Sequence, residues 1–150
     1  MSIKSLLAAL VVSLSLVAPV YAQDASKGLS AYKRGDFAAA LQEWRPLAEQ
    51  GAAQAQHNLG LLYLTGKGVA RNYAEALAWI RKAAQQGSAP AQNSLGTMYG
   101  NGRGVPKDYA VAAKWFRLSA EQGNASGQVN LGLLHYRGQI RPPNLAEAAK

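Results

Sequence analysis

The chain has 150 residues, and its 16 Lys and Arg against 8 Asp and Glu give it a formal net charge of +8. It contains no cysteine, which excludes disulfide scaffolds, cysteine-ligated metal sites and thiol nucleophiles, and its two histidines argue against a histidine-built metal site. Charged residues make up 16% of the chain, so little material is available for acid–base catalysis. We therefore expect no enzymatic activity, no cofactor and no resident metal.

Residues 1–22 have the order of a secretory signal peptide. Lys4 precedes an apolar run from Leu6 to Val17, and the segment ends on the small-residue pattern Val20-Tyr21-Ala22. The run is shorter than the ~20 residues that span a bilayer, although an uncleaved anchor is the alternative. We expect cleavage after Ala22, which leaves a mature chain of charge 15 − 8 = +7. That chain would be periplasmic or secreted, with no stable membrane insertion.

Residues 23–150 repeat with a period of 36 residues. Two full units, 51–86 and 87–122, share 17 identical residues out of 36 aligned positions. A divergent unit covers residues 25–50, and an incomplete unit covers residues 123–150. A period of this length without β-branched runs is typical of stacked helical hairpins. The expected fold is all-α, an α/α solenoid of about four antiparallel helix pairs.

Each unit can be explained as two helices. Leu59 and Tyr63 lie four residues apart on one amphipathic face, and Gly66 follows as a residue that can end a helix in the left-handed conformation. Asn72 is placed to cap the second helix, with Glu75 completing a capping box.

Several positions recur in successive units and are therefore assigned to packing. Glycine inside a helix costs about 1 kcal/mol relative to alanine, so its recurrence indicates close approach by a neighbouring helix or ring. The recurring aromatic residues are interpreted as interlocking core, with a ligand-binding aromatic cage as the alternative. These structural repeat positions are Gly60, Gly96, Gly132, Tyr63, Tyr99, Trp79 and Trp115.

The repeated pattern A-x-A-Q-x-x-L-G-x-x-Y-x-x-G-x-G-V-x-x-[DN]-Y-x-x-A-x-x-W resembles the Sel-one-like repeat family, relatives of tetratricopeptide repeats. Two units carry it throughout. The third departs from it, because His135 stands where Tyr63 and Tyr99 stand and the tryptophan would fall at position 151. The resemblance implies a right-handed superhelix and a bacterial adaptor that acts in envelope assembly, exopolysaccharide control, signalling or host contact.

One candidate binding surface is a basic edge formed by the inter-helix loops. A stack would align these cations, which could attract an acidic protein, an anionic polysaccharide, a cell-wall polymer or lipid headgroups. The alternative is a solvated face that keeps the protein soluble, and nucleic acid is not expected as a target after export. Arg45, Arg81 and Arg117 also recur at the repeat spacing and are expected along the outer helices. The edge comprises Lys67, Arg71, Arg103, Lys107, Arg137 and Arg141.

A second candidate surface is a concave groove lined by the first helix of each unit, the arrangement that the resemblance implies. Varied residues on a constant frame suit the binding of a peptide or a helix, although they are also ordinary exposed positions. We expect His57 at the surface there and His135 in the tyrosine slot. The groove candidates are His57, Leu61, Leu64, Asn93, Thr97, Val129 and Leu133.

Enzyme-like motifs are weak. Ser30 and Lys33 match the Ser-x-x-Lys pattern of penicillin-recognising enzymes, but the companion motifs are absent. Residues 100–104 are glycine-rich like a phosphate-binding loop, yet they are expected to follow a helix rather than a strand.

The preferred hypothesis is an exported, non-enzymatic scaffold for protein–protein interaction in the bacterial envelope. Binding of an anionic envelope polymer is the alternative, and a β-lactamase-like or cell-wall enzyme is the third hypothesis.

Overall fold

A computed structural model describes residues 17–141 and the side chains of residues 25–141. Within this range the chain forms helices and turns, with no strand. Most of the predicted signal peptide lies outside the described residues, and the first described helix continues through the predicted cleavage point at Ala22. None of the described helices is both long and apolar enough to cross a membrane. The helices are α2 (Val17–Lys33), α3 (Phe37–Glu49), α4 (Ala53–Thr65), α5 (Tyr73–Gln85), α6 (Ala89–Asn101), α7 (Tyr109–Glu121) and α8 (Ala125–Tyr136).

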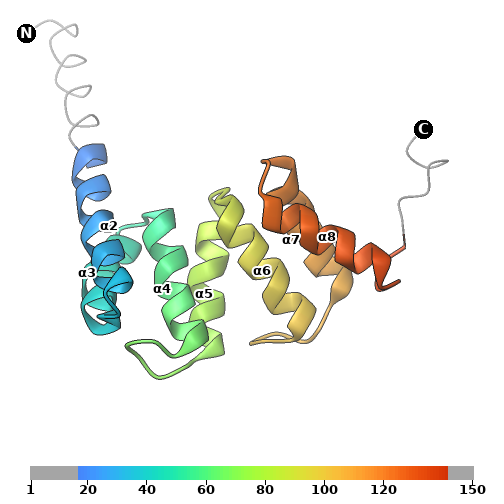
Figure 1. Cartoon of the computed structure of the whole chain (residues 1–150), viewed down its shortest axis with the longest axis horizontal. Helices are drawn as coiled ribbons and strands as arrows, with labels where there is room; N and C mark the ends of the chain where they lie inside the picture. The colour runs from blue at the N-terminus through green and yellow to red at the C-terminus, as the bar shows by residue number, and fades with distance from the viewer. Residues whose placement is uncertain (1–16, 142–150) are drawn as a thin grey trace, which may run out of the picture.

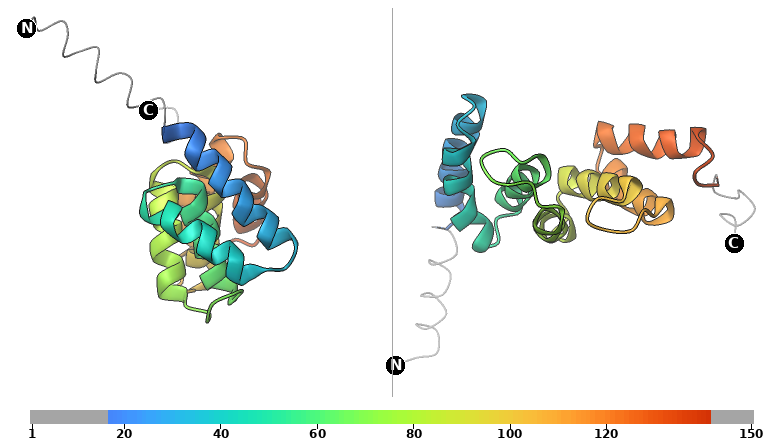
Figure 2. Two further views of the ribbon diagram at one scale, coloured as in Figure 1. Left: turned by 90° about the vertical axis from the view of Figure 1, so that its left-hand side faces the viewer. Right: turned by 90° about the horizontal axis from the view of Figure 1, so that it is seen from below.

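The helices pack in chain order, each mainly on the helices before and after it (Figure 1). The pairs α2–α3, α4–α5 and α6–α7 are the first three units, and α8 is the first helix of the fourth. Helices α4, α6 and α8 lie on one side of the row, and α5 and α7 lie on the other (Figure 2). The predicted all-α solenoid is therefore confirmed, because contacts run between neighbours along the row rather than around one centre.

The local signals for helix ends act as the sequence predicts, except that the capping box is not formed: the backbone N–H of Asn72 donates to the Tyr63 carbonyl at 2.9 Å rather than to Glu75. The Asn72 side chain accepts hydrogen bonds from the backbone N–H groups of Ala74 and Glu75, at 3.0 and 3.1 Å. Gly66 ends α4 in the left-handed region, with a φ of 71°, and Gly102 ends α6 in the same way, with a φ of 67°. Helices α4, α5, α6 and α7 all have 13 residues; side-chain caps start α5, α6 and α7, whereas α4 begins after Ala52 without one.

The helical glycines of the two full units are in close contact with the second helix of their own unit. A Cβ atom at Gly60 would lie 2.5 Å from Cγ1 of Ile80, and one at Gly96 would lie 2.7 Å from Cδ1 of Phe116. Gly132 of α8 differs, because no described atom lies within 4 Å of its Cβ position. Its partner helix would start at residue 145 by the repeat spacing, beyond the described range.

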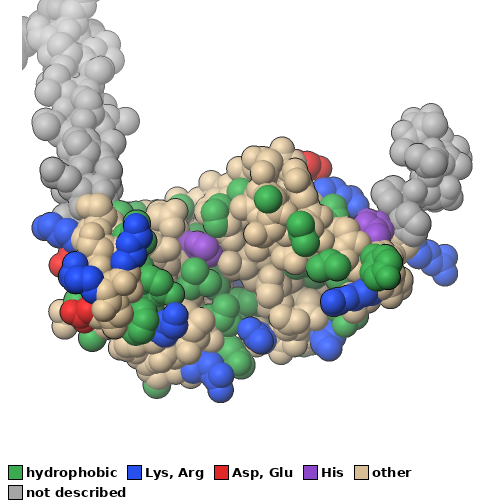
Figure 3. Space-filling view, viewed as in Figure 1, with side chains coloured by type: hydrophobic (Ala, Val, Ile, Leu, Met, Phe, Trp, Pro, Cys, Tyr) green, Lys and Arg blue, Asp and Glu red, His purple; other side chains and the backbone are tan. Residues whose placement is uncertain are grey.

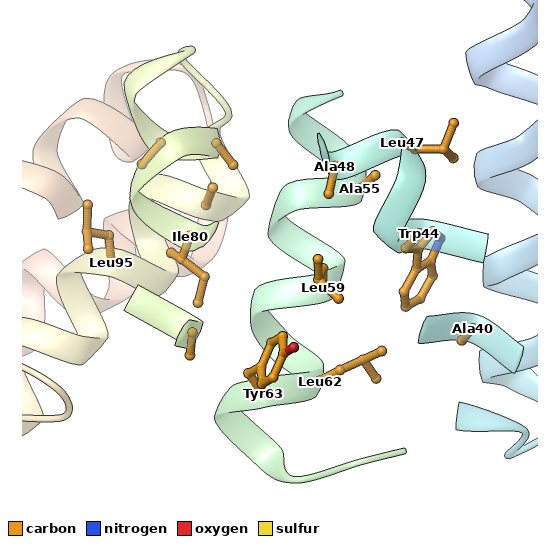
Figure 4. Close-up of a cluster of buried hydrophobic side chains, with 14 of the residues drawn as sticks. Ala40, Trp44, Leu47, Ala48, Ala55, Leu59, Leu62, Tyr63, Ile80 and Leu95 are labelled. Carbon is orange, nitrogen blue, oxygen red and sulfur yellow. The ribbon is translucent and has the colours of Figure 1, made fainter. Parts of the chain in front are cut away.

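Buried apolar side chains form two clusters. The larger one runs from α2 to α6 and includes Trp44, Leu59, Ile80 and Leu95 (Figure 4). The smaller one joins α7 to α8 through Ala112, Ala113, Phe116 and Leu134. Tyr63 is buried in the larger cluster, and the repeat positions Tyr99, Trp79 and Trp115 are half-buried against it. These aromatic residues thus lie in the packing between helices.

Candidate functional site

The predicted groove residues all lie on α4, α6 and α8, so we call this side of the row the first-helix face (Figure 3). Their exposure differs strongly along the row. Val129 and Leu133 on α8 are 60% and 38% exposed, whereas Leu61, Leu64, Asn93 and Thr97 are half-buried. Leu61, Leu64, Asn93 and Thr97 lie on helices that are followed by a further described first helix, whereas Val129 and Leu133 lie on α8, the last helix that the structure describes.

His57 does not lie at the surface as expected. Its side chain is 7% exposed, and its Nε2 atom lies 2.9 Å from the Ser94 hydroxyl, so it links α4 to α6. Burial lowers the pKa of His57 from 6.5 to about 4, so the ring is neutral at pH 7. One unit later, the Asn130 side chain donates to Oδ1 of Asn93 at 2.8 Å, from α8 to α6. Each bond joins residues 37 positions apart, and this shared separation is a signal that sequence reasoning missed.

A serine hydroxyl beside a neutral imidazole is the smallest arrangement that can activate a nucleophile. In enzymes a third group orients the imidazole. Nδ1 of His57 is buried and has no hydrogen-bond partner among the described residues. The pair is therefore better explained as a link between units.

Ser30 and Lys33 are both exposed on α2, without the desolvation that activates a Ser–Lys pair. The described part of the chain holds no group of three or more metal-ligating side chains.

The basic edge has one half-buried member and five exposed ones, of which Arg71 and Lys107 lie over the rings of Tyr73 and Tyr109, at 5.5 and 5.9 Å from the ring centres. Lys67 is half-buried; its Nζ atom donates to the Tyr32 hydroxyl at 3.1 Å and lies 4.9 Å from the centre of the Phe37 ring. It therefore packs the α4–α5 loop onto the first unit. Lys and Arg side chains gather along the loop edge of the molecule (Figure 3). The exposed members are Arg71, Arg103, Lys107, Arg137 and Arg141.

The recurring arginines of the outer helices are not all free for ligands. Arg45 donates to the Tyr63 hydroxyl at 2.8 Å, and Arg81 donates to the Tyr99 hydroxyl at 3.2 Å. Each bond joins the second helix of one unit to the first helix of the next. Arg117 is exposed, because the next unit has His135 in the tyrosine position. The common spacing of Arg and Tyr could have revealed this link, which sequence reasoning did not identify.

Buried glutamines form a second link that sequence reasoning missed. Nε2 of Gln86 donates to Oε1 of Gln56 at 2.7 Å, and Nε2 of Gln122 donates to Oε1 of Gln92 at 2.8 Å. Gln56 and Gln92 are buried and also donate to the last turn of the preceding helix. These repeated hydrogen bonds hold successive units in a fixed register, so the first-helix face is preorganised.

A pocket of about 210 Å³ opens between α6, α7 and α8. It brings together residues from both predicted surfaces, because Thr97 and Leu133 belong to the groove and Lys107 and Arg137 belong to the basic edge. Phe116 and Leu134 line it as well. The groove and the edge therefore meet at one place, at the C-terminal end of the described array.

Comparison with known proteins gives a consistent result. The Sel1 repeat family model matches residues 53–88, 89–124 and 125–150. A protective antigen present in uropathogenic Escherichia coli strains, whose crystal structure displays an SLR fold, is 37% identical with a TM-score of 0.72; the match covers 79% of this chain and 26% of the antigen. A Sel1 repeat protein from Oxalobacter formigenes is 36% identical with a TM-score of 0.71; the match covers 77% of this chain and 46% of that protein. No match was found among the curated proteins.

Proposed function

This chain belongs to the Sel1 repeat family, and we propose that it is an exported, non-catalytic scaffold that binds a protein partner through its first-helix face. Sel1 repeat proteins are in general scaffolds for protein–protein interaction. The chain spans 26% and 46% of the two solved relatives, so a partner is proposed for these units alone.

The observation that carries the proposal is the concentration of exposed apolar side chains on α8. Five large hydrophobic residues are exposed in the described part of the chain, and three of them, Val129, Leu133 and Tyr136, lie on this helix. Tyr136 is 88% exposed. Exposed aromatic and aliphatic side chains next to a polar, cationic rim are typical of a protein-binding surface. The fixed register of the units lowers the entropy cost of binding.

Site-specific photo-crosslinking in the source cell tests this proposal. A photoreactive amino acid replaces Leu133 on the first-helix face, and in a control variant it replaces Leu118, which is 43% exposed on α7. We expect a discrete protein adduct from position 133 and none from position 118. Adducts of equal yield from both positions, or none from position 133, would contradict a specific protein-binding face.

Binding of an anionic envelope polymer is a second candidate, supported by the five exposed cations of the basic edge. Such binding depends on screened charges, so it should weaken steeply between low salt and physiological salt. Equilibrium binding to a purified acidic polysaccharide, with Arg71 and Arg103 changed to Gln, checks this. Binding that persists unchanged in high salt would remove this candidate.

Export is proposed from the N-terminal segment. Cleavage after Ala22 would leave Gln23 as the first residue, and Gln23–Lys33 would remain of α2. Mass spectrometry of the N-terminal peptide from the secreted or periplasmic fraction should begin at Gln23. A protein retained with residues 1–22 intact would contradict export by cleavage.

A further inference from the structure

We propose that the pocket between α6, α7 and α8 binds an acidic segment of the partner protein, taking one large apolar side chain inside and pairing the neighbouring carboxylates with Lys107 and Arg137. This inference rests on the proposed function and names the chemistry of the partner.

The pocket has room for one apolar side chain, and its lining combines apolar residues with polar ones, among them Asn101, Asn130 and Gln139. Its volume of about 210 Å³ exceeds the ~150 Å³ of an apolar cavity that admits benzene. The buried Phe116 and Leu134 and the half-exposed Leu133 supply apolar walls. An aromatic or leucine side chain placed against these apolar walls would be partly removed from water.

The rim of the pocket carries positive charge alone. Lys107 comes from the α6–α7 loop and Arg137 follows α8, and both side chains are exposed. No Asp or Glu is among the residues that line the pocket. Carboxylates on either side of the inserted residue would therefore meet unlike charges, and an Arg–carboxylate pair can form two parallel hydrogen bonds.

The pocket exists because this unit departs from the preceding one. Thr97 and Gly100 occupy the positions of Leu61 and Leu64, whose side chains pack against the core at α4. A Cβ atom at Gly100 would have only Ala112 Cβ nearby, at 3.7 Å, so the packing has room for a larger residue. Glycine within a helix is unfavourable by about 1 kcal/mol relative to alanine. The preceding unit shows that the repeat can hold leucine at both positions, so the pocket results from the smaller residues Thr97 and Gly100.

The placement of Arg137 also differs between the two intervals. The residue one unit earlier is Asn101, whereas Gln139, which also lines the pocket, stands where the preceding unit has Arg103. The two intervals therefore have the same number of cations at these positions, and they differ in where the second cation lies. An extended anionic polymer would need a row of cations but no apolar pocket, so these observations favour a protein segment.

The experiment is a selection of random displayed peptides against the full chain. Peptides are counter-selected on the double variant Thr97→Leu/Gly100→Leu, in which the residues of the preceding unit fill the pocket. We expect selected peptides to share one large apolar residue flanked by Asp or Glu. Synthetic copies, measured by fluorescence anisotropy, should bind the filled variant at least about tenfold more weakly, a difference of about 1.4 kcal/mol.

Two further variants separate local charge from general charge. Lys107→Gln/Arg137→Gln should weaken binding several-fold and reduce its salt dependence. Arg71→Gln, the position of Lys107 one unit earlier, removes a cation away from the pocket and should leave the affinity unchanged. Circular dichroism of each variant confirms that the helices are retained.

Peptides without acidic residues, or peptides that bind the filled variant equally well, would overturn the proposal. Polyglutamate that binds wild type and filled variant alike, with no selected peptide showing a preference, would also overturn it and assign the cations to polymer binding. A natural partner that crosslinks at position 133 and binds the filled variant normally would overturn the pocket but leave the proposed function standing. Selected acidic peptides that bind the pocket, with no crosslinked partner in the cell, would overturn the proposed function alone.

Discussion

Two neighbouring intervals of the array share one backbone plan but differ in what fills them. Between α4 and α6, Leu61 and Leu64 pack against the core and Met98 is fully buried. Between α6 and α8, the equivalent residues are Thr97, Gly100 and Leu134, and a pocket remains. The repeat frame fixes where the helices lie, and a few side chains decide whether the space between them is core or binding site.

The links between units differ only in part. The His57–Ser94 bond has a counterpart in the Asn93–Asn130 bond of the next interval, whereas the Arg81–Tyr99 bond has none, because Arg117 is exposed and the tyrosine position holds His135. The next interval therefore keeps one of these two links and lacks the other.

The largest effect should come from removing an equivalent leucine in the two regions. Leu95 is fully buried, and Leu131, one unit later, is half-buried. Leu95→Ala should lower the free energy of unfolding by about 2–5 kcal/mol, because it leaves a cavity in the core. Leu131→Ala should lower the free energy of unfolding by only about 1 kcal/mol, because this side chain is half-buried. Urea unfolding of both variants measures the two losses. Equal losses would mean that the two intervals are packed alike.

Acid should weaken the interior link through His57. Its pKa is about 4 in the folded chain and 6.5 in the unfolded chain, so the unfolded state binds the proton first as the pH falls. Stability is full above pH 6.5 and declines towards pH 4, by up to about 3 kcal/mol.

The matched control for this pH effect is His57→Asn, which places the residue of position 93 at position 57. The stability difference between wild type and variant should shrink by about 2–3 kcal/mol between pH 7.5 and 4.5, because only wild type carries this proton linkage. Urea unfolding at the two pH values measures it. A difference that does not change with pH would show that the imidazole is accessible to protons in the folded chain.

The helical glycines should respond with opposite signs. Gly60→Ala forces the new methyl group against Ile80 and should destabilise by about 1–3 kcal/mol. Gly132→Ala meets no described atom and should stabilise by up to about 1 kcal/mol through helix propensity. Thermal unfolding of both variants checks this. A destabilising Gly132→Ala would show that a neighbour packs there as closely as at Gly60.

The glutamine link should show the smallest difference. Gln92→Leu removes the acceptor of Gln122 and the donor to the Ala84 carbonyl in a buried place, which should cost about 1–2 kcal/mol. Gln128 donates to the Ala120 carbonyl at 3.4 Å in the equivalent place, but its side chain is exposed, so Gln128→Leu should change stability by less than about 0.5 kcal/mol. Urea unfolding of the two variants measures the difference. Similar costs would show that the exposed bond stabilises the chain as much as the buried pair.

The fold and the helix ends could be predicted because they depend on local signals. Asn72 and Gly66 act within their own turns, and the 36-residue period fixes the stacking. The contacts of His57 could not be predicted in the same way, because Ser94 comes close only through the offset between successive units. The pocket was also missed, since it depends on residues that are small relative to their equivalents. The sequence pattern places its members Thr97 and Leu133 on the groove and Lys107 and Arg137 on the basic edge, whereas the structure brings all four together.

The central claim is that the interval between α6 and α8 is left open for a partner at a cost in stability. The most direct measurement compares Thr97→Leu/Gly100→Leu with wild type for both thermal midpoint and crosslinking yield at position 133. The account predicts a higher midpoint, by at least about 2 °C, together with loss of the adduct. An unchanged or lower midpoint, with the adduct retained, would contradict it.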